Sequence, residues 1–182
     1  MTQFPFAVAD IEELNNKWLK YRDMKQTGAF KQYRQKWKNA KIKLGELEKN
    51  IAHQRKYASP DLDDSSWVNI NAPGLWDDLG FRGMKGEAWY RKTINIPASW
   101  AGRELEFSPG ATDEIESSYF NGVLVGKTGS VLPYDTNGWD EQRSYTVPAN
   151  LVKAGKVVIA VRAVNLIGAG GITSNNDPDK MY

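Results

Sequence analysis

Two residue types with special chemistry are scarce in this sequence of 182 residues: cysteine is absent, and histidine occurs once, as His53. Without cysteine the chain cannot form a disulfide, a thiolate nucleophile or a cysteine zinc site. With one histidine it cannot build a zinc site from several imidazoles, and serine–histidine catalysis would have to use that one ring. These absences weigh against an enzyme, and we expect no catalytic residue, metal or other cofactor.

Long hydrophobic runs are also absent. No apolar run approaches the roughly 18 residues that a membrane-spanning helix needs, so we expect no membrane partner. The N-terminus lacks a basic stretch followed by an apolar one, so no secretory signal peptide is visible. On that reading the protein is either cytoplasmic or an excerpt of a longer chain.

The charges divide unevenly along the chain. Residues 1–60 contain 13 lysines and arginines against 6 aspartates and glutamates, whereas residues 61–182 contain 11 against 16. This asymmetry indicates two differently built segments, a helical arm over residues 1–60 and a β domain over residues 61–182. The arm is basic enough to suggest nucleic acid, but its lysines lie off its apolar stripes, as in an ordinary amphipathic helix. We therefore expect no nucleic-acid partner.

Hydrophobic residues at steps of three and four predict two helices in the arm. Asp10 and Glu13 resemble a capping box at the start of the first helix. The second helix should end near Ala58, because Pro60 disfavours a helical residue before it and has no amide donor. The two stripes are Ile11, Leu14, Trp18 and Tyr21, then Phe30, Tyr33, Trp37, Ala40, Leu44, Leu47 and Ile51.

Beyond residue 60 the pattern changes to short β-rich runs separated by glycine, proline and asparagine, which is typical of strands. Asn121-Gly122 predicts a type I′ hairpin, because both turn positions need positive φ angles. No helical pattern separates the strands, so an antiparallel β-sandwich of the jelly-roll kind is favoured over a parallel sheet. The predicted strands span residues 67–71, 88–96, 104–108, 117–120, 123–126, 144–147 and 156–164.

Acidic residues form two clusters, Asp61/Asp63/Asp64 and Asp113/Glu114/Glu116. Paired carboxylates serve glycosidases and calcium sites, but neither cluster has the glycine and glutamate positions of an EF-hand. We interpret both clusters as solvated turns, with a calcium site between loops as the alternative. His53 lies on the predicted long helix, away from any Gly-x-Ser-x-Gly signature, and we expect it to be solvated.

Aromatic residues divide between strands and loops. Those in strand patterns are expected to pack in the sandwich, namely Trp67, Trp89, Tyr90, Tyr119, Phe120 and Tyr145. Others lie in polar connections around residues 73–78 and 133–140, where an aromatic face beside carboxylates suits sugar recognition. Burial of these loop aromatics is an alternative of equal weight. The predicted carbohydrate-binding residues are Trp76, Asp77, Tyr134, Asp135, Trp139 and Arg143.

An ordered series of motifs runs through the β domain, beginning with Asn71-Ala-Pro-Gly-Leu-Trp-Asp-Asp-Leu-Gly80 and Gly86-Glu-Ala-Trp-Tyr-Arg-Lys-Thr-Ile-Asn-Ile-Pro97. Further motifs follow at residues 110–116, 119–126, 143–148 and 159–172. The series resembles the sugar-binding jelly roll of family 2 glycoside hydrolases, and most closely the version inside bacterial sialate O-acetylesterases. Individual matches are Trp89-Tyr90-Arg91, Asp113, Asn121-Gly122, Arg143 and Tyr145. Pro109 departs from the pattern, where leucine is expected, and removes an amide donor there.

The resemblance implies a galactose-binding-like sandwich that serves as a non-catalytic accessory domain. In that family the SGNH-type catalytic domain carries a Gly-Asp-Ser block and an Asp-x-x-His block, and neither occurs in this sequence. The implied partners are a glycan or sialoside and the catalytic domain of the parent chain. Parent enzymes of this kind act on external glycans, which implies a secreted or periplasmic location. The alternative function is a structural scaffold that binds no sugar.

Overall fold

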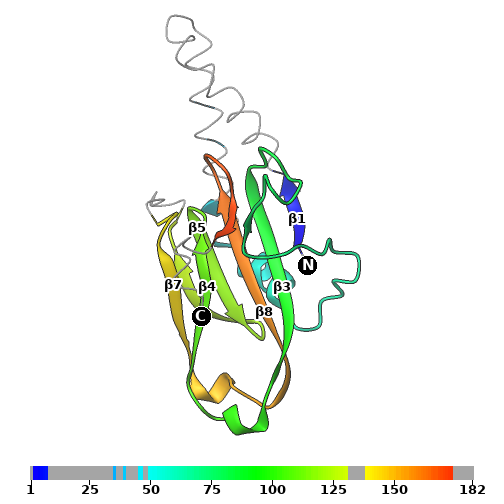
Figure 1. The fold of residues 1–182 in the computed structure, drawn as a ribbon, viewed down its shortest axis with the longest axis vertical. Helices are drawn as coiled ribbons and strands as arrows, with labels where there is room; N and C mark the ends of the chain where they lie inside the picture. The colour runs from blue at the N-terminus through cyan, green and yellow to red at the C-terminus, as the bar shows by residue number, and fades with distance from the viewer. Residues whose placement is uncertain are drawn as a thin grey trace, which may run out of the picture.

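The computed structural model describes residues 2–7, 35, 39, 45–46, 49–130 and 138–173. In these residues two antiparallel sheets form a β-sandwich (Figure 1). Sheet A has the strand order β1-β3-β8-β5-β6, and sheet B has the order β2-β9-β4-β7. The mostly β, antiparallel sandwich predicted from the strand pattern is therefore confirmed.

The strands of sheet A are β1 (Thr2–Ala7), β3 (Gly86–Ile96), β8 (Gly155–Asn165), β5 (Ile115–Phe120) and β6 (Val123–Thr128). Those of sheet B are β2 (Gly74–Leu75), β9 (Gly171–Thr173), β4 (Leu105–Thr112) and β7 (Gln142–Val147). Two 3₁₀ turns, η1 (Ala98–Trp100) and η2 (Ala149–Leu151), begin after Pro97 and Pro148. Proline suits that position because its φ is fixed and its missing amide is not needed there.

The predicted hairpin joins β5 to β6, and Asn121 and Gly122 have φ angles of 50° and 84°. Two positive φ angles are what a type I′ turn requires, so this prediction is confirmed. Pro109 lies where the pairing of β4 with β7 shifts register, between Phe107 and Gly110. The missing amide of Pro109 therefore coincides with a local irregularity in a ladder that continues on both sides.

Three strand expectations differ from the structure. Residues 67–71 form no strand apart from a bridge at Val68, and the first strand of sheet B comes later, at β2. Strand β1 lies in the segment that was expected to be a helical arm. Pro5 is tolerated there because β1 is at the edge of sheet A and its register shifts between Gln3 and Phe6. Strand β9 is too short to leave an alternating pattern in the sequence.

The described residues contain one complete α-helix, α3 (Ile51–Ala58), and not the two that were predicted. It ends immediately before Ser59 and Pro60, as expected. The described residues 35, 39, 45, 46 and 49 are also helical, so the second predicted helix is interrupted at Asn50. Asn50 leaves the helical conformation, and its side chain accepts a hydrogen bond from the His53 amide at 3.0 Å. The first predicted helix lies outside the described residues. No helix in the described part is long and apolar enough to cross a membrane.

Hydrophobic residues are buried on both faces of sheet A. Between the sheets, Ala88, Tyr90 and Val161 pack with Trp76 and Ile172. The outer face is covered by α3, which lies behind sheet A in Figure 1. Alternate residues of a strand point to opposite faces, so β3 contributes to both clusters. The outer cluster contains Tyr57, Ala58, Trp67, Trp89, Tyr119 and Ala160, so three aromatics expected between the sheets lie under the helix instead.

Candidate functional site

A buried ionic cluster joins α3 to sheet A around Glu87, whose side chain has no exposed surface. The Glu87 carboxylate accepts hydrogen bonds from His53 Nε2, Trp89 Nε1 and Arg162 Nε, each at 2.7 Å. Burial raises the pKa of Glu87, but the His53 hydrogen bond and the Arg162 charge outweigh burial and lower it to about 2. The expectation of a solvated His53 is therefore wrong, because α3 lies on the sheet and covers the ring.

The second acidic cluster is buried, which contradicts its interpretation as a solvated turn. Asp113 and Glu114 are 7% and 6% exposed, and Glu116 is fully buried. The turn between β4 and β5 is covered by the chain after β8, where the Glu114 carboxylate accepts hydrogen bonds from the amides of Leu166 and Ile167 at 2.7 and 3.0 Å. Glu114 thus positions the loop at residues 166–170.

In the first acidic cluster, Asp61 and Asp63 are exposed, as predicted. Asp64 is partly buried, and its carboxylate pairs with Arg91 Nε at 3.0 Å. Arg91 also donates to the carbonyl of Tyr57 at the end of α3. Asp64 therefore supports the contact between the helix and the sheet, while Asp61 and Asp63 face solvent.

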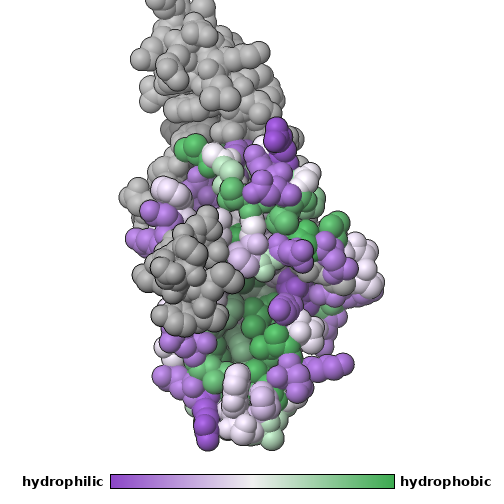
Figure 2. Space-filling view, in the orientation of Figure 1, coloured by the Kyte–Doolittle hydropathy of each residue, from purple (hydrophilic) through white to green (hydrophobic). Residues whose placement is uncertain are grey.

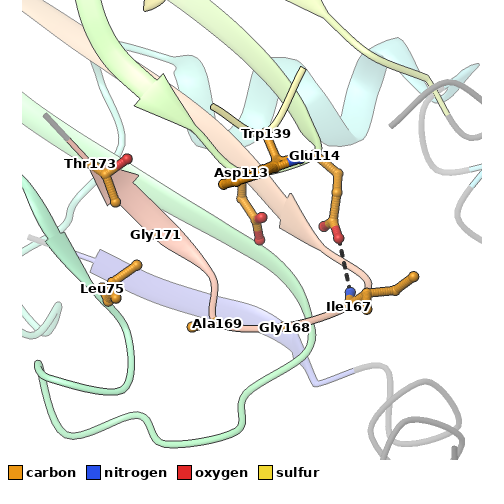
Figure 3. Close-up of a pocket in the computed structure, with 9 residues that line it drawn as sticks. All are labelled: Leu75, Asp113, Glu114, Trp139, Ile167, Gly168, Ala169, Gly171 and Thr173. Carbon is orange, nitrogen blue, oxygen red and sulfur yellow. Dashed lines mark hydrogen bonds between the residues drawn. The ribbon is translucent and has the colours of Figure 1, made fainter. Parts of the chain in front are cut away.

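A cleft of about 580 Å³ opens beside the buried carboxylates (Figure 3). Asp113 and Glu114 form its floor, and one wall is formed by Ile167, Gly168, Ala169 and Gly171. Trp139 and Ile167, which are 61% and 48% exposed, place apolar surface at its rim. The cleft thus combines an exposed aromatic ring with two carboxylates.

Arg143 positions the turn that carries Trp139. The guanidinium donates to the carbonyl of Thr112 at 2.5 Å and to that of Asp113 at 3.3 Å, and also to the carbonyl of Glu141. These bonds join the turn after Trp139 to the turn that carries the carboxylates. Because Arg143 is 2% exposed and faces backbone carbonyls, it supports the cleft from behind.

The surroundings of Asp113 and Glu114 disfavour the ionised form of both carboxyls. Burial, together with the neighbouring Glu114 charge, raises the pKa of Asp113 well above its ordinary value, and burial also raises the pKa of Glu114. The buried Lys85 is the nearby cation, and its pKa is lowered by burial although Asp113 and Glu114 act in the other direction. The floor can accept hydrogen bonds from hydroxyl groups, while the tryptophan ring can stack on the C–H face of a sugar.

Stability should pass through a maximum at mildly acidic pH. The pKa of Glu87 is about 2 in the fold against 4.5 ordinarily, so the unfolded chain binds more protons between those values, and the free energy of unfolding falls as pH drops through them. Asp113, Glu114 and Glu116 act oppositely, because their raised pKa values make the fold bind more protons as they titrate. Urea unfolding from about pH 2 to 8 measures this, and a steady rise in stability to neutral pH would contradict it.

The six predicted sugar-binding residues do not all meet in the cleft. Trp139 lies at its rim, and Arg143 lies behind it. Asp77 is partly buried and accepts a hydrogen bond from the amide of Gly83 at 2.9 Å. Trp76 has no exposed surface, and its Nε1 donates to the Tyr90 hydroxyl at 2.5 Å. The prediction that Trp76 binds sugar is therefore wrong, and the alternative of a buried loop aromatic holds for it. The remaining two, Tyr134 and Asp135, lie outside the described residues.

Asp113 and Glu114 were missed as site residues. Their sequence signal was visible as an acidic pair, but an acidic pair in a polar connection is usually solvated. The loop that buries Glu114 comes 52 positions later in the chain. Among the described residues, no group of three or more histidine, aspartate or glutamate side chains could hold a metal ion, so the calcium alternative gains no support there.

A second hollow, of about 750 Å³, lies between the sheets where β3 and β4 stand apart. Figure 2 shows hydrophobic side chains gathered in a hollow at this place. Its apolar lining includes Phe107, Ile159 and Val161. This hollow has a different character from the Trp139 cleft, since it exposes part of the interior of the sandwich.

No family model matches the chain, and no curated protein matches it in sequence. Among solved structures, it is similar to Bacteroides uniformis β-glucuronidase 2 at a TM-score of 0.50 and 23% identity, over 64% of this chain and 15% of that one. A glycosyl hydrolase family 2 member from Bacteroides cellulosilyticus matches at 0.51 and 24%, over 64% and 17%. Ruminococcus gnavus β-glucuronidase matches at 0.50 and 16%, over 64% and 19%. In each of these enzymes the matched part is less than a fifth of the chain, and this protein shares the fold of that part.

Proposed function

We propose that this chain is a non-catalytic, carbohydrate-binding accessory domain of a larger carbohydrate-active enzyme, and that the Trp139 cleft holds the sugar. The observation that carries this proposal is the exposed ring of Trp139 beside the buried carboxylates of Asp113 and Glu114. Sugar sites combine an aromatic face for the C–H surface with polar groups for the hydroxyls. The fold shared with parts of glycoside hydrolases supports the same class of ligand.

For the parent protein we propose a carbohydrate esterase of the sialate O-acetylesterase kind, with a secreted or periplasmic location. The support is the ordered motif series from residue 71 to residue 172. The catalytic step would belong to an SGNH-type domain elsewhere in the parent, since this chain has neither the Gly-Asp-Ser nor the Asp-x-x-His block. The accessory domain would then hold the glycan while the catalytic domain acts on it.

Replacing Trp139 with alanine should abolish the fluorescence response of the chain to a bound sugar. A titration with galactosides, glucosides and sialosides should give saturable quenching in the wild type. The dissociation constant should rise roughly tenfold or more in the variant, because losing about 1.4 kcal/mol of stacking has that effect. Isothermal calorimetry measures the same change without depending on the probe.

The matched control for Trp139→Ala is Trp100→Ala. Trp100 is 48% exposed and lies in η1 after β3, outside the cleft. This variant should bind sugar as the wild type does. Equal loss of binding in both variants, or no response to any sugar, would contradict the carbohydrate-binding proposal.

A second candidate function is that of a scaffold that packs against the catalytic domain. The apolar hollow between β3 and β4 favours it, because exposed apolar surface of this kind marks contact sites. A chain that ignores every sugar, but gains stability when the catalytic domain is added, would support the scaffold function instead.

A further inference from the structure

We infer that the Trp139 cleft selects uncharged sugars and rejects sugars that carry a carboxylate, such as uronic and sialic acids. This inference rests on the proposed function, because it names the ligand class of the same cleft. A sialylated glycan would then have to present one of its uncharged units to this domain.

The charge distribution of the cleft supports the selection. Its floor carries Asp113 and Glu114, and none of the described residues that line it is a lysine, arginine or histidine. Asp140 and Glu141 follow Trp139, but both are exposed and neither lines the cleft, so solvent and salt screen their charges. A ligand carboxylate would therefore enter a partly desolvated cleft that offers it no cation, and it would also meet like charge wherever the floor carboxyls are ionised.

The one arginine beside the cleft does not offset this charge. Arginine is the residue that most often binds a carboxylate, because its guanidinium forms two parallel hydrogen bonds with it. Arg143 instead donates to the backbone carbonyls of Thr112, Asp113 and Glu141. Lys85 is also buried, at 2% exposure, and does not line the cleft.

The carboxyl of Asp113 is directed into the cleft (Figure 3). Asp113 is more than nine-tenths buried, and its Oδ2 atom has no hydrogen-bond partner among the described residues. Glu114 differs, because its oxygens already accept from the amides of Leu166 and Ile167. An unpartnered buried acceptor needs a donor, which a sugar hydroxyl supplies and a carboxylate does not.

The test compares matched pairs of sugars that differ at one carbon. Methyl β-glucoside and methyl β-glucuronide differ only in a hydroxymethyl group against a carboxylate at C6, and methyl galactoside and methyl galacturonide form a second pair. We expect the uncharged member to bind the wild-type chain at least about tenfold more tightly in calorimetry at alkaline pH, since the cleft offers a carboxylate no cation and its ionised floor repels it. This comparison needs no variant and so cannot fail through misfolding.

Two variants then locate the source of the selection. At alkaline pH, where the carboxyl of Asp113 ionises despite its raised pKa, Asp113→Asn should bring the two affinities of each pair to within about threefold, because it removes that charge from the cleft. Asp140→Asn removes an exposed charge beside Trp139 and should leave the preference intact. Circular dichroism and thermal unfolding check that both variants fold.

The possible results separate the inference from the proposed function. If the acidic sugar of each pair binds as tightly as the neutral one, or more tightly, the selection is wrong and the carbohydrate-binding proposal stands. A preference that disappears in Asp140→Asn but survives in a folded Asp113→Asn overturns the role given to Asp113. If no member of either pair binds, the proposed function fails, and the inference fails with it.

Discussion

Replacing Glu87 with glutamine should lower the free energy of unfolding by about 3–5 kcal/mol, which is the cost of removing one partner from a buried ion pair. Glu87 and Arg162 both have fully buried side chains, and their atoms are 2.7 Å apart. A neutral amide leaves the Arg162 charge without its counter-ion in a site that water does not reach. The amide group would also face the donors of His53 and Trp89 with fewer acceptor positions than a carboxylate.

Urea unfolding followed by tryptophan fluorescence measures this loss. For a chain of this length, 3–5 kcal/mol corresponds to a fall of roughly 6–20 °C in the unfolding temperature. The matched control is Glu104→Gln, at an exposed position just before β4, which should change stability by less than about 0.5 kcal/mol. A Glu87→Gln variant within about 1 kcal/mol of the wild type would show that the cluster contributes little to the fold.

The Glu87 cluster also connects the end of the predicted arm to the β domain through side-chain hydrogen bonds. His53 belongs to α3, whereas Glu87 and Arg162 belong to β3 and β8. The Tyr119 hydroxyl donates to Gln54 Oε1 at 2.7 Å and adds a second polar contact between the helix and the sheet. The last part of the predicted arm, up to residue 58, therefore packs on sheet A, although the sequence pattern changes only at residue 60.

Features that depend on neighbouring residues could be predicted from the sequence. The turn at Asn121 needs only two residues that accept positive φ angles, and the end of α3 needs only the proline at position 60. The alternation of apolar and polar residues likewise places the longer strands of both sheets. Each of these signals lies within a few residues of the feature that it determines.

Features that depend on distant segments could not be predicted in this way. Glu87 and Arg162 lie 75 positions apart, and a solitary glutamate in a strand gives no sign that an arginine will face it. Trp76 lies in a polar connection, yet Gly170 packs against its ring so closely that a Cβ there would lie 2.4 Å from it. The carboxylates of the cleft are buried by a loop that follows β8. Burial of polar residues is thus set by the tertiary contacts, which local pattern does not encode.

Replacing Gly171 with alanine should destabilise the chain by about 2–6 kcal/mol and remove its response to sugars. Gly171 has a φ of 146°, and a Cβ built on it would lie 2.5 Å from the carbonyl oxygen of Gly74 in β2. The strained φ costs about 1–3 kcal/mol, and the contact with rigid backbone adds a similar amount.

The effect on the cleft follows from the position of Gly171. It lines the cleft, and its carbonyl accepts a hydrogen bond from the Asp113 amide at 3.1 Å. Any shift of β9 away from β2 therefore moves the floor carboxylate relative to Trp139. The control is Gly155→Ala at the start of β8, where φ is 103° but no atom lies within 4 Å of the added Cβ. It should cost only the conformational strain and leave sugar binding unchanged, so equal losses in the two variants would show that the β2–β9 contact does not shape the cleft.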